Sequence, residues 1–308
     1  MSQQITPAFT QQYNANLMHL SQQKGSKLRN AVRKESQKGK SEFYDRLGQN
    51  TAVVRSSRHA DTPQIDSLHS RRRVTLVDYE WADLIDDQDK IRMLINPQSE
   101  YVVAAMWALG RAIDDVIIAA ATGTAYGDET GSTSVVLPDT QKYAANDGTS
   151  FTNLNIDTLR AVKRMFDAND VDESIPRFWV LGSRQLESLL GQTEVTSSDF
   201  ASVKALVQGE VDSFMGFKFI RTERLTGSVT YTASASTGAV GSGTSSTGNR
   251  KNFAFAMDGL LLAIGEDMVS KIDPRPDKGY ATQVYARMSV GSTRMEEVKV
   301  VEVGCKES

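Results

Sequence analysis

Apolar residues recur every three or four positions between residues 97 and 123, which is the period of one face of an α-helix. Asn96 is a good N-cap, Pro97 suits the first helical turn, and Gly123 follows the last periodic residue. The pattern therefore predicts one long helix, about 39 Å at ~1.5 Å per residue. The expected inner stripe consists of Val102, Met106, Leu109, Ile113, Val116, Ile117 and Ala120.

A two-residue alternation precedes this helix. Arg73–Trp81 alternates in strand fashion, Thr51–Arg55 is also rich in β-forming residues, and Arg58–Ser70 between them is polar and contains Pro63. We therefore expect a long hairpin over residues 48–81. Two exposed strands are only marginally stable by themselves, so this hairpin is expected to need a partner surface, which another subunit could supply.

The second half of the chain alternates between short helical and strand patterns. Helices are expected from Asn155 or Asp157 to Ala168, from a cap at Ser183 to Gly191, and over Asp258–Ile264. Strands are expected at Arg177–Gly182, Gly216–Ile220, Phe253–Met257, Tyr280–Val290 and Glu297–Val303, with Val284, Ala286, Met288 and Val290 sharing a face. Residues 226–249 are rich in Gly, Ser and Thr, which predicts a surface loop.

Charge is distributed unevenly along the 308 residues. Residues 1–75 carry 13 Lys and Arg against 5 Asp and Glu, whereas residues 76–308 carry 22 against 33. A basic front and an acidic body can attract each other between neighbouring subunits. Residues 1–40 are polar and basic and contain few large apolar residues after Leu28, so they are expected to become ordered only against another surface. We favour an arm over acidic protein surface, and a nucleic-acid-binding tail is the alternative.

The residue types needed for bond-making chemistry are not grouped in the sequence. The three histidines, His19, His59 and His69, are remote from acidic clusters at ligand spacing, and no HExxH, CxxC or GxSxG motif occurs. Gly243–Arg250 has the two glycines of a phosphate-binding loop but lacks its Lys and its strand–helix context. We therefore expect no enzyme activity, no cofactor and no metal.

An acidic set at residues 80–89 is the remaining candidate site. It could suggest a divalent cation, but the central Gly of a calcium-binding loop is missing. We favour a solvated or subunit-facing acidic patch, which in the second case could meet Arg71–Arg73 of a neighbour. Each exposed pair would contribute only ~0–1 kcal/mol, but an assembly of many copies would repeat it many times.

Two further features bear on location. Residues 1–20 lack the apolar core of a signal peptide, and the longest apolar stretch, Tyr101–Gly110, is too short to span a membrane. The single Cys305 excludes an internal disulfide and favours a reducing compartment. Synthesis in a cytoplasm without membrane association is the expectation.

The order of these parts resembles the major capsid protein of tailed double-stranded DNA bacteriophages. The resemblance covers about residues 42–305, and no single segment is as specific as a metal motif. The resembling segments are Arg58–Pro63 (RHADTP), Arg71–Asp87 (RRRVTLVDYEWADLIDD), Asn96–Pro97, Gly110–Ile118 (GRAIDDVII), Phe178–Leu190 (FWVLGSRQLESLL), Gly209–Leu225 (GEVDSFMGFKFIRTERL) and Ser289–Val298 (SVGSTRMEEV).

The resemblance implies an α+β fold with an N-terminal arm, an elongated β-hairpin loop, a peripheral domain with a long spine helix, and an axial domain. In this chain the arm would be residues 1–40, the elongated loop 41–92, and the peripheral domain 93–150. The axial domain would be residues 151–250, with a surface loop at 226–249, and residues 251–308 would return to the axial and peripheral domains.

The implied function is a structural protein that self-assembles into hexamers and pentamers of an icosahedral head. This head would enclose double-stranded DNA without reading its sequence. Because the arm is shorter than the scaffolding region of some relatives, a separate scaffolding protein is expected, together with a portal protein and possibly a decoration protein. The protein would be made in the host bacterial cytoplasm and reside in the virion. A non-viral nanocompartment shell of the same fold is the alternative.

The candidate contact residues between subunits have charged side chains on or near the predicted hairpin. They are Arg58, Arg71, Arg72, Arg73, Glu80, Asp83, Asp86 and Asp87.

Overall fold

The computed structural model describes residues 20–55, 57–59, 61, 62, 64–86, 98–145, 152–192, 213–225, 232, 233, 240, 241 and 249–306. The chain divides into two compact units. The first unit contains the N-terminal residues up to Ser26 with residues 77–113 and 266–290, and the second contains residues 27–76, 114–265 and 291–308. The domain ranges expected from the sequence stay predictions.

The long helix α2 covers Gln98–Thr122, which confirms the predicted helix, while Asn96 and Pro97 lie outside the described residues. Its buried face includes Ala105, Leu109, Ile113 and Ile117, spaced by four, whereas Val116 and Ala120 of the predicted stripe are partly exposed. The helix ends as expected, because the Gly123 N–H donates to the carbonyl of Ala119 at 3.0 Å.

Gly110 stands inside α2 because the chain passes very close to it. A Cβ at this position would lie 2.7 Å from the backbone of Gly25 and 2.8 Å from the nitrogen of Ser26. Beside this crossing, Arg111 donates to the Gln22 side chain at 2.9 Å, and Lys24 lies over the Trp107 ring. Residues 22–26 are therefore packed along the helix within the first unit.

The strands of the first unit form an antiparallel arrangement. Strand β4 (Val77–Ile85) pairs with β15 (Ala281–Arg294), from Thr282 opposite Ile85 to Val290 opposite Val77. The sheet order places β4 at an edge and β15 beside β14 (Leu260–Arg275). The predicted alternation in β15 is confirmed, because Val284, Ala286, Met288 and Val290 are all buried. A short 3-10 turn, η4 (Pro276–Lys278), lies between β14 and β15.

The helix predicted over Asp258–Ile264 is wrong. A 3-10 turn, η3 (Met257–Gly259), is followed directly by β14. The run Leu260–Ala263 is apolar without interruption, and its side chains are fully buried. A short continuous apolar run fits a strand covered on both faces as well as it fits a helix, and periodicity alone cannot separate the two.

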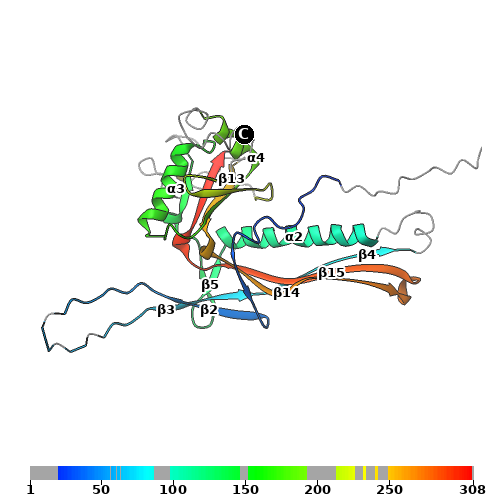
Figure 1. The fold of residues 1–308 in the computed structure, drawn as a ribbon, viewed down its shortest axis with the longest axis horizontal. Helices are drawn as coiled ribbons and strands as arrows, with labels where there is room; N and C mark the ends of the chain where they lie inside the picture. Colours follow the sequence, from blue (N-terminus) through cyan, green and yellow to red (C-terminus); the bar gives the residue numbers. More distant parts are fainter. Residues whose placement is uncertain are drawn as a thin grey trace, which may run out of the picture. The chain divides into compact units, whose positions relative to one another are not determined.

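The second unit contains a six-stranded sheet in the order β7-β16-β13-β8-β10-β9. The strands are β7 (Lys142–Ala144), β8 (Arg177–Leu181), β9 (Ser213–Phe214), β10 (Phe217–Arg221), β13 (Asn249–Ala256) and β16 (Val300–Lys306). Helices α3 (Ile156–Ala168) and α4 (Ser183–Leu190) lie against it (Figure 1). The two helices share one apolar core with the sheet, in which the Trp179 ring meets Phe217 edge-on at 5.4 Å.

Local signals in this part of the chain were read correctly from the sequence, with one exception. Asn155 caps α3 by accepting from the Thr158 N–H at 2.7 Å, and α4 ends at Gly191 as predicted. The N-cap of α4 is Gly182 and not Ser183. Within residues 226–249, β11 (Thr232–Ala233) pairs with β12 (Val240–Gly241), and most of the predicted loop lies outside the described residues.

A smaller sheet in the second unit has the order β2-β3-β5-β6. Its strands are β2 (Ser41–Leu47), β3 (His69–Thr75), β5 (Ala125–Gly127) and β6 (Thr133–Val135). The predicted hairpin exists, but its limbs were placed wrongly. β3 pairs with β2 instead of with Thr51–Arg55, which forms no strand, and the run after Thr75 becomes β4 and pairs with β15.

Residues 27–40 pack against their own chain, which corrects the expectation that residues 1–40 order only against another surface. Leu28 and Val32 are fully buried, and β1 (Arg33–Ser36) pairs in parallel with residues 261–264 of β14. The buried carboxylate of Asp114 accepts hydrogen bonds from the N–H groups of Lys27 and Leu28, both at 3.0 Å. Residues 1–19 lie outside the described part of the chain.

Candidate assembly interface

The hairpin of β2 and β3 continues into an elongated loop, which we define as residues 48–68. Beyond the ladder, Gly48 N–H donates to the Leu68 carbonyl at 2.8 Å and Asn50 donates to the Ser67 hydroxyl at 2.8 Å. The described part of the loop between these contacts forms no strand or helix and extends away from the β2–β3 ladder (Figure 1). Such a loop is held only at its base and gains little from its own contacts.

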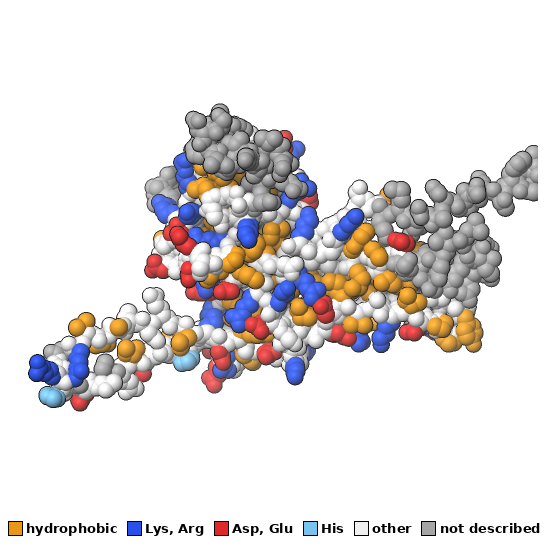
Figure 2. All heavy atoms as spheres, viewed as in Figure 1, with side chains coloured by type: hydrophobic (Ala, Val, Ile, Leu, Met, Phe, Trp, Pro, Cys, Tyr) orange, Lys and Arg blue, Asp and Glu red, His pale blue; other side chains and the backbone are white. Residues whose placement is uncertain are grey.

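Large apolar side chains are exposed along this loop and at its base. Val54 is 89% exposed, and the others are Leu47, Val53, Ile65 and Leu68. Figure 2 shows hydrophobic side chains along the loop and Lys or Arg side chains at its far end. Residues in that part include Arg55, Arg58 and His59, all exposed. A concentration of exposed apolar groups marks a surface that another protein covers.

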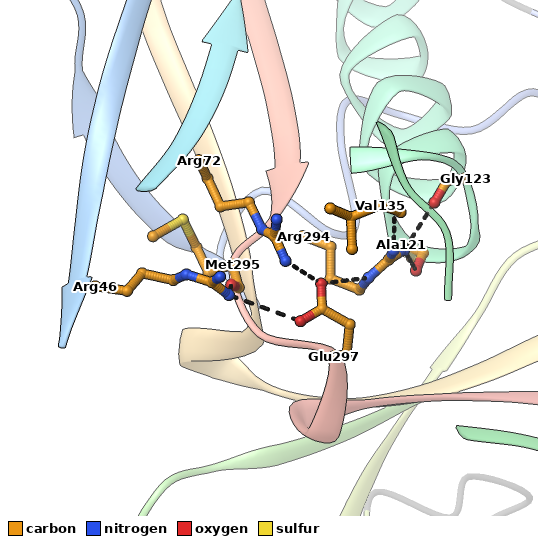
Figure 3. A network of polar contacts seen from close by, with 8 residues as sticks. All are labelled: Arg46, Arg72, Ala121, Gly123, Val135, Arg294, Met295 and Glu297. Atoms are coloured by element: carbon orange, nitrogen blue, oxygen red, sulfur yellow. Dashed lines mark hydrogen bonds and ion pairs between the residues drawn. The ribbon is translucent and has the colours of Figure 1, made fainter. Parts of the chain in front are cut away.

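A cluster of guanidinium groups surrounds one carboxylate at the base of the loop (Figure 3). Arg72 of β3 pairs with Glu297 in the 3-10 turn η5 (Glu297–Lys299), while Arg46 of β2 lies 3.7 Å and Arg294 of β15 lies 3.8 Å from the same carboxylate. The side chains of Arg72 and Arg294 are 4% and 0% exposed. Burial lowers the pKa of both guanidinium groups, and Glu297 opposes this change.

Arg294 also joins the cluster to the end of α2. Its guanidinium donates to the carbonyls of Ala121 at 3.1 Å and Gly123 at 2.8 Å, and to the Val135 carbonyl at 3.0 Å. Carbonyls at a helix C-terminus lack partners within the helix and carry partial negative charge, so a buried cation is favourable there. Glu297 and Arg294 together fix β3, β15 and the helix end as one rigid base for the loop.

The three consecutive arginines of β3 have different surroundings, because successive side chains of a strand point to opposite faces. Arg71 pairs with Asp45 at 3.3 Å and lies over the Phe43 ring, and Arg73 lies over the Tyr126 ring. Arg72 points to the opposite face, where it is buried against Glu297. The Arg72 side chain is enclosed within its own chain, so Arg71 and Arg73 are the better candidates for a contact with a neighbouring subunit.

The predicted acidic patch lies on β4 in the first unit. Glu80 accepts a hydrogen bond from Tyr285, whose pKa is raised by desolvation and by this carboxylate. Asp83 accepts from the Leu84 N–H at 2.8 Å, and Asp86 is exposed just after the strand. Among the described residues, Glu80, Asp83 and Asp86 form no ion pair with a Lys or Arg of their own chain. Asp87 lies outside the described residues.

The described residues offer little for catalysis. They include no group of three or more His, Cys, Asp or Glu side chains that could hold a metal ion. Separately, none of the described helices is long and apolar enough to cross a membrane. Cys305 lies in β16 and is fully buried, which raises the pKa of its thiol to about 12. A thiol in this state is a poor nucleophile.

Glu302 is a second buried ionisable group in the second unit. It lies in β16 opposite Lys142 of β7, and its carboxylate is 3.6 Å from the Lys251 ammonium. Burial raises its pKa to about 7, with Lys142 acting in the opposite direction. Glu302 is buried on β16, which lies between β7 and β13 in the sheet, so we interpret it as a structural group.

Sequence reasoning missed the residues that organise the loop base, Arg46, Arg294 and Glu297. The available signal was Arg294 itself, a charge at the end of a strand whose neighbours alternate as buried apolar residues. A charge in such a position requires a partner, because an unpaired buried guanidinium is very costly. The sequence could not identify that partner, since Glu297 serves two arginines that lie more than two hundred residues earlier in the chain.

Comparison with known proteins agrees with this arrangement. The family model described as "Phage capsid protein" matches residues 5–307. No curated protein matches the chain. Among solved structures, the capsid of the cyanophage P-SCSP1u is 17% identical with a TM-score of 0.74, covering 100% of this chain and 96% of that one.

Two further phage capsids have a similar fold. The capsid of Ralstonia phage GP4 is 9% identical with a TM-score of 0.71, and that of Helicobacter pylori bacteriophage KHP30 is 12% identical with a TM-score of 0.70. Each comparison covers 98% of this chain and 96% of the other. Identities this low show the fold alone, whereas the family match spans nearly the whole sequence. The chain therefore belongs to the phage capsid protein family and is a structural subunit of a bacteriophage capsid.

Proposed function

We propose that this chain is the shell subunit that forms the hexamers and pentamers of an icosahedral phage head and encloses double-stranded DNA. The observation that carries the proposal is the family match over residues 5–307, together with an elongated loop whose apolar side chains are exposed in the single chain. A solitary subunit would leave this surface in water, and association between copies removes it. The proposed role is structural and involves no catalysis.

In this proposal the loop of one subunit reaches a neighbour, while the arginine–glutamate cluster holds its base rigid. Exposed Arg58 and the half-buried Arg71 and Arg73 remain candidates for contacts with acidic groups of other copies. The acidic candidates are Glu80, Asp83, Asp86 and Asp87. Each exposed pair contributes only ~0–1 kcal/mol, so specificity comes from many repeated contacts and from the apolar surface between them.

Partners of the assembled shell follow from the same role. We infer a separate scaffolding protein, a portal protein, a decoration protein as an optional partner, and packaged DNA that is held without sequence recognition. The subunit would be made in the host bacterial cytoplasm and would reside in the virion. A nanocompartment shell is less well supported, because the matching family is one of phage capsid proteins.

Expression of the chain alone and with its candidate scaffolding protein tests the proposal. Negative-stain electron microscopy should reveal capsomers, tubes or closed icosahedral shells. Homogeneous monomers at every salt concentration, with and without the scaffolding protein, would contradict the assembly role. Packaged DNA would be measured separately, as nuclease-resistant DNA in particles from infected cells.

A further inference from the structure

Thr51–Arg55, with the sequence TAVVR, has the composition of a strand but has no strand partner in its own chain. All five residues are exposed and lie outside the described strands and helices. Val and Thr are strong β-formers, and a β-rich segment left unpaired at an exposed site is available to pair with another sheet edge. The strand that the sequence predicts at this position therefore has no pairing partner among the described strands of one copy.

The edge strand β4 has a length that can accept such a strand. β4 is nine residues long, stands last in its sheet, and pairs only with β15 among the described strands. Its exposed residues include Glu80 and Leu84, and Leu84 is 45% exposed. Among the described residues, Glu80, Asp83 and Asp86 form no ion pair. Arg287 stands opposite Glu80 on β15, but it is paired with Glu266 at 2.9 Å.

The charges of the two segments match in one antiparallel register. Arg55 and Arg58 are separated by three positions, and so are Glu80 and Asp83. Placing Arg55 opposite Asp83 brings Arg58 opposite Glu80. The same register places Val54, the most exposed apolar residue of the loop, opposite Leu84.

The parallel orientation and the other described edges fit less well. A parallel register that sets Arg55 opposite Asp83 moves Arg58 past the end of the strand to Asp86 and leaves Val54 opposite Ala82. The edge strands β6 and β7 have three residues each, β9 has two, and β1 carries its own cations, Arg33 and Lys34. On β2, Asp45 is already paired with Arg71.

We propose that Thr51–Arg55 of one copy adds as an antiparallel strand to the β4 edge of a second copy, with Arg55 opposite Asp83 and Arg58 near Glu80. This contact rests on the proposed shell function and specifies how the elongated loop engages its neighbour. Backbone hydrogen bonds along β4 would supply affinity, and the two charge pairs would set the register. The apolar pair Val54–Leu84 would be covered at the same time.

Crosslinking between copies tests the register directly. Full-length Val54→Cys protein is co-assembled with full-length Leu84→Cys protein, so that a disulfide between these two positions can form only between copies. Directly opposite residues have Cα atoms about 4.5–5.5 Å apart, within the range that a disulfide spans. The matched control combines Val53→Cys with Leu84→Cys, because a shift of one residue turns the side chain to the other face. The native Cys305 is buried and should contribute no background.

Strand addition predicts a crosslinked dimer from the Val54 and Leu84 pair and, from the Val53 and Leu84 pair, no more than the wild-type level. Particles that form without a Val54–Leu84 crosslink would overturn the contact while leaving the shell function intact. Equal crosslinking of both pairs would show that the loop does not bind its neighbour as an added strand. If wild-type protein forms no particles or capsomers under any condition, the shell function itself fails, and this contact fails with it.

Charge reversal provides a second measurement on the same register. Arg58→Glu and Glu80→Arg should each lower the yield of particles, and the double variant should recover most of that loss because it restores the pair in swapped form. Both side chains are exposed, but Glu80 accepts from Tyr285 and stands opposite Arg287, so urea denaturation of each unassembled variant checks that the subunit still folds. A double variant that assembles no better than the worse single variant would contradict the pairing of Arg58 with Glu80.

Discussion

Arg72 and Arg58 belong to the same hairpin and have the same side chain, but their surroundings differ in almost every respect. Arg72 is buried at the base, where Glu297, Arg46 and Arg294 complete a fixed cluster. Arg58 is exposed in the loop and has no acidic partner among the described residues. For these two arginines, burial separates a charge that stabilises the subunit from one that is available for contacts between subunits.

The largest effect is expected from Arg294→Met, which removes the buried cation at the end of α2. Three carbonyl groups lose their donor and Glu297 loses a neighbour, so the free energy of unfolding should fall by about 3–5 kcal/mol. Urea denaturation of the unassembled subunit measures this. Arg224→Met is the matched control, because Arg224 pairs with Asp115 at a partly exposed site and should contribute no more than ~1 kcal/mol. Equal losses in the two variants would contradict the distinction between buried and exposed arginines.

Glu302→Gln extends the comparison to a buried carboxyl group, which becomes neutral when it binds a proton. Burial raises its pKa in the folded state from 4.5 to about 7, so folding is favoured when the group is protonated. The wild-type protein should therefore lose stability as the pH rises from about 4.5 through 7, and this loss should be complete above the folded pKa.

The Gln side chain does not ionise, so the variant should be more stable than wild type at pH 8, by up to about 3 kcal/mol. The advantage should disappear near pH 4. Unfolding curves across this pH range, measured on unassembled protein, give the difference directly. A constant difference at every pH would show that Glu302 does not titrate as its burial predicts.

Arg72→Ala compared with Arg71→Ala separates two neighbours on one strand. Arg72 loses a buried, charge-assisted contact with Glu297, which should cost about 1.5–3 kcal/mol of unfolding free energy. Arg71 loses an exposed pair with Asp45 and should change stability by no more than ~1 kcal/mol. The same denaturation experiment compares them, and the reverse order would refute the assignment of opposite faces.

The smallest effect on subunit stability is expected from Arg58→Ala. Because this side chain is exposed, the free energy of unfolding should stay within about 0.5 kcal/mol of wild type. Particle yield should nevertheless fall, as measured by sedimentation of assembled material. Gln64→Ala, another exposed substitution in the same loop, serves as the control and should leave the yield unchanged. A clear fall in the free energy of unfolding with an unchanged particle yield would instead give Arg58 a structural role like that of the buried arginines at the base of the loop.

Segments with strong local signals were predicted correctly. The apolar period specified α2, and Asn155 marked the start of α3, because a side chain that caps a helix acts within its own turn. The alternation of β15 likewise identified its buried face. These features depend on neighbours within a few residues, which the sequence contains directly.

Errors arose where the partner of a segment was distant in the chain. The helix predicted over Asp258–Ile264 is wrong, because only the surrounding sheet makes Leu260–Ile264 part of a strand. Thr51–Arg55 was assigned to the hairpin because its composition is right, although β2 occupies the pairing position beside β3. The arm predicted over residues 1–40 includes residues 27–40, which pack on their own chain, because nothing local shows that Asp114 accepts hydrogen bonds from the N–H groups of Lys27 and Leu28.

The sequence by itself determined the long helix, most of the short elements and the separation of a basic front from an acidic body, because periodicity, caps and charge are local properties. Only the tertiary structure decided which arginine of Arg71–Arg73 is enclosed, which carboxylate neutralises it, and which edge of the sheet stays open. Those outcomes depend on burial and on contacts between residues far apart in the chain. The physical reason is that the energy of a charge is set by its surroundings in space, and the sequence order does not specify those surroundings.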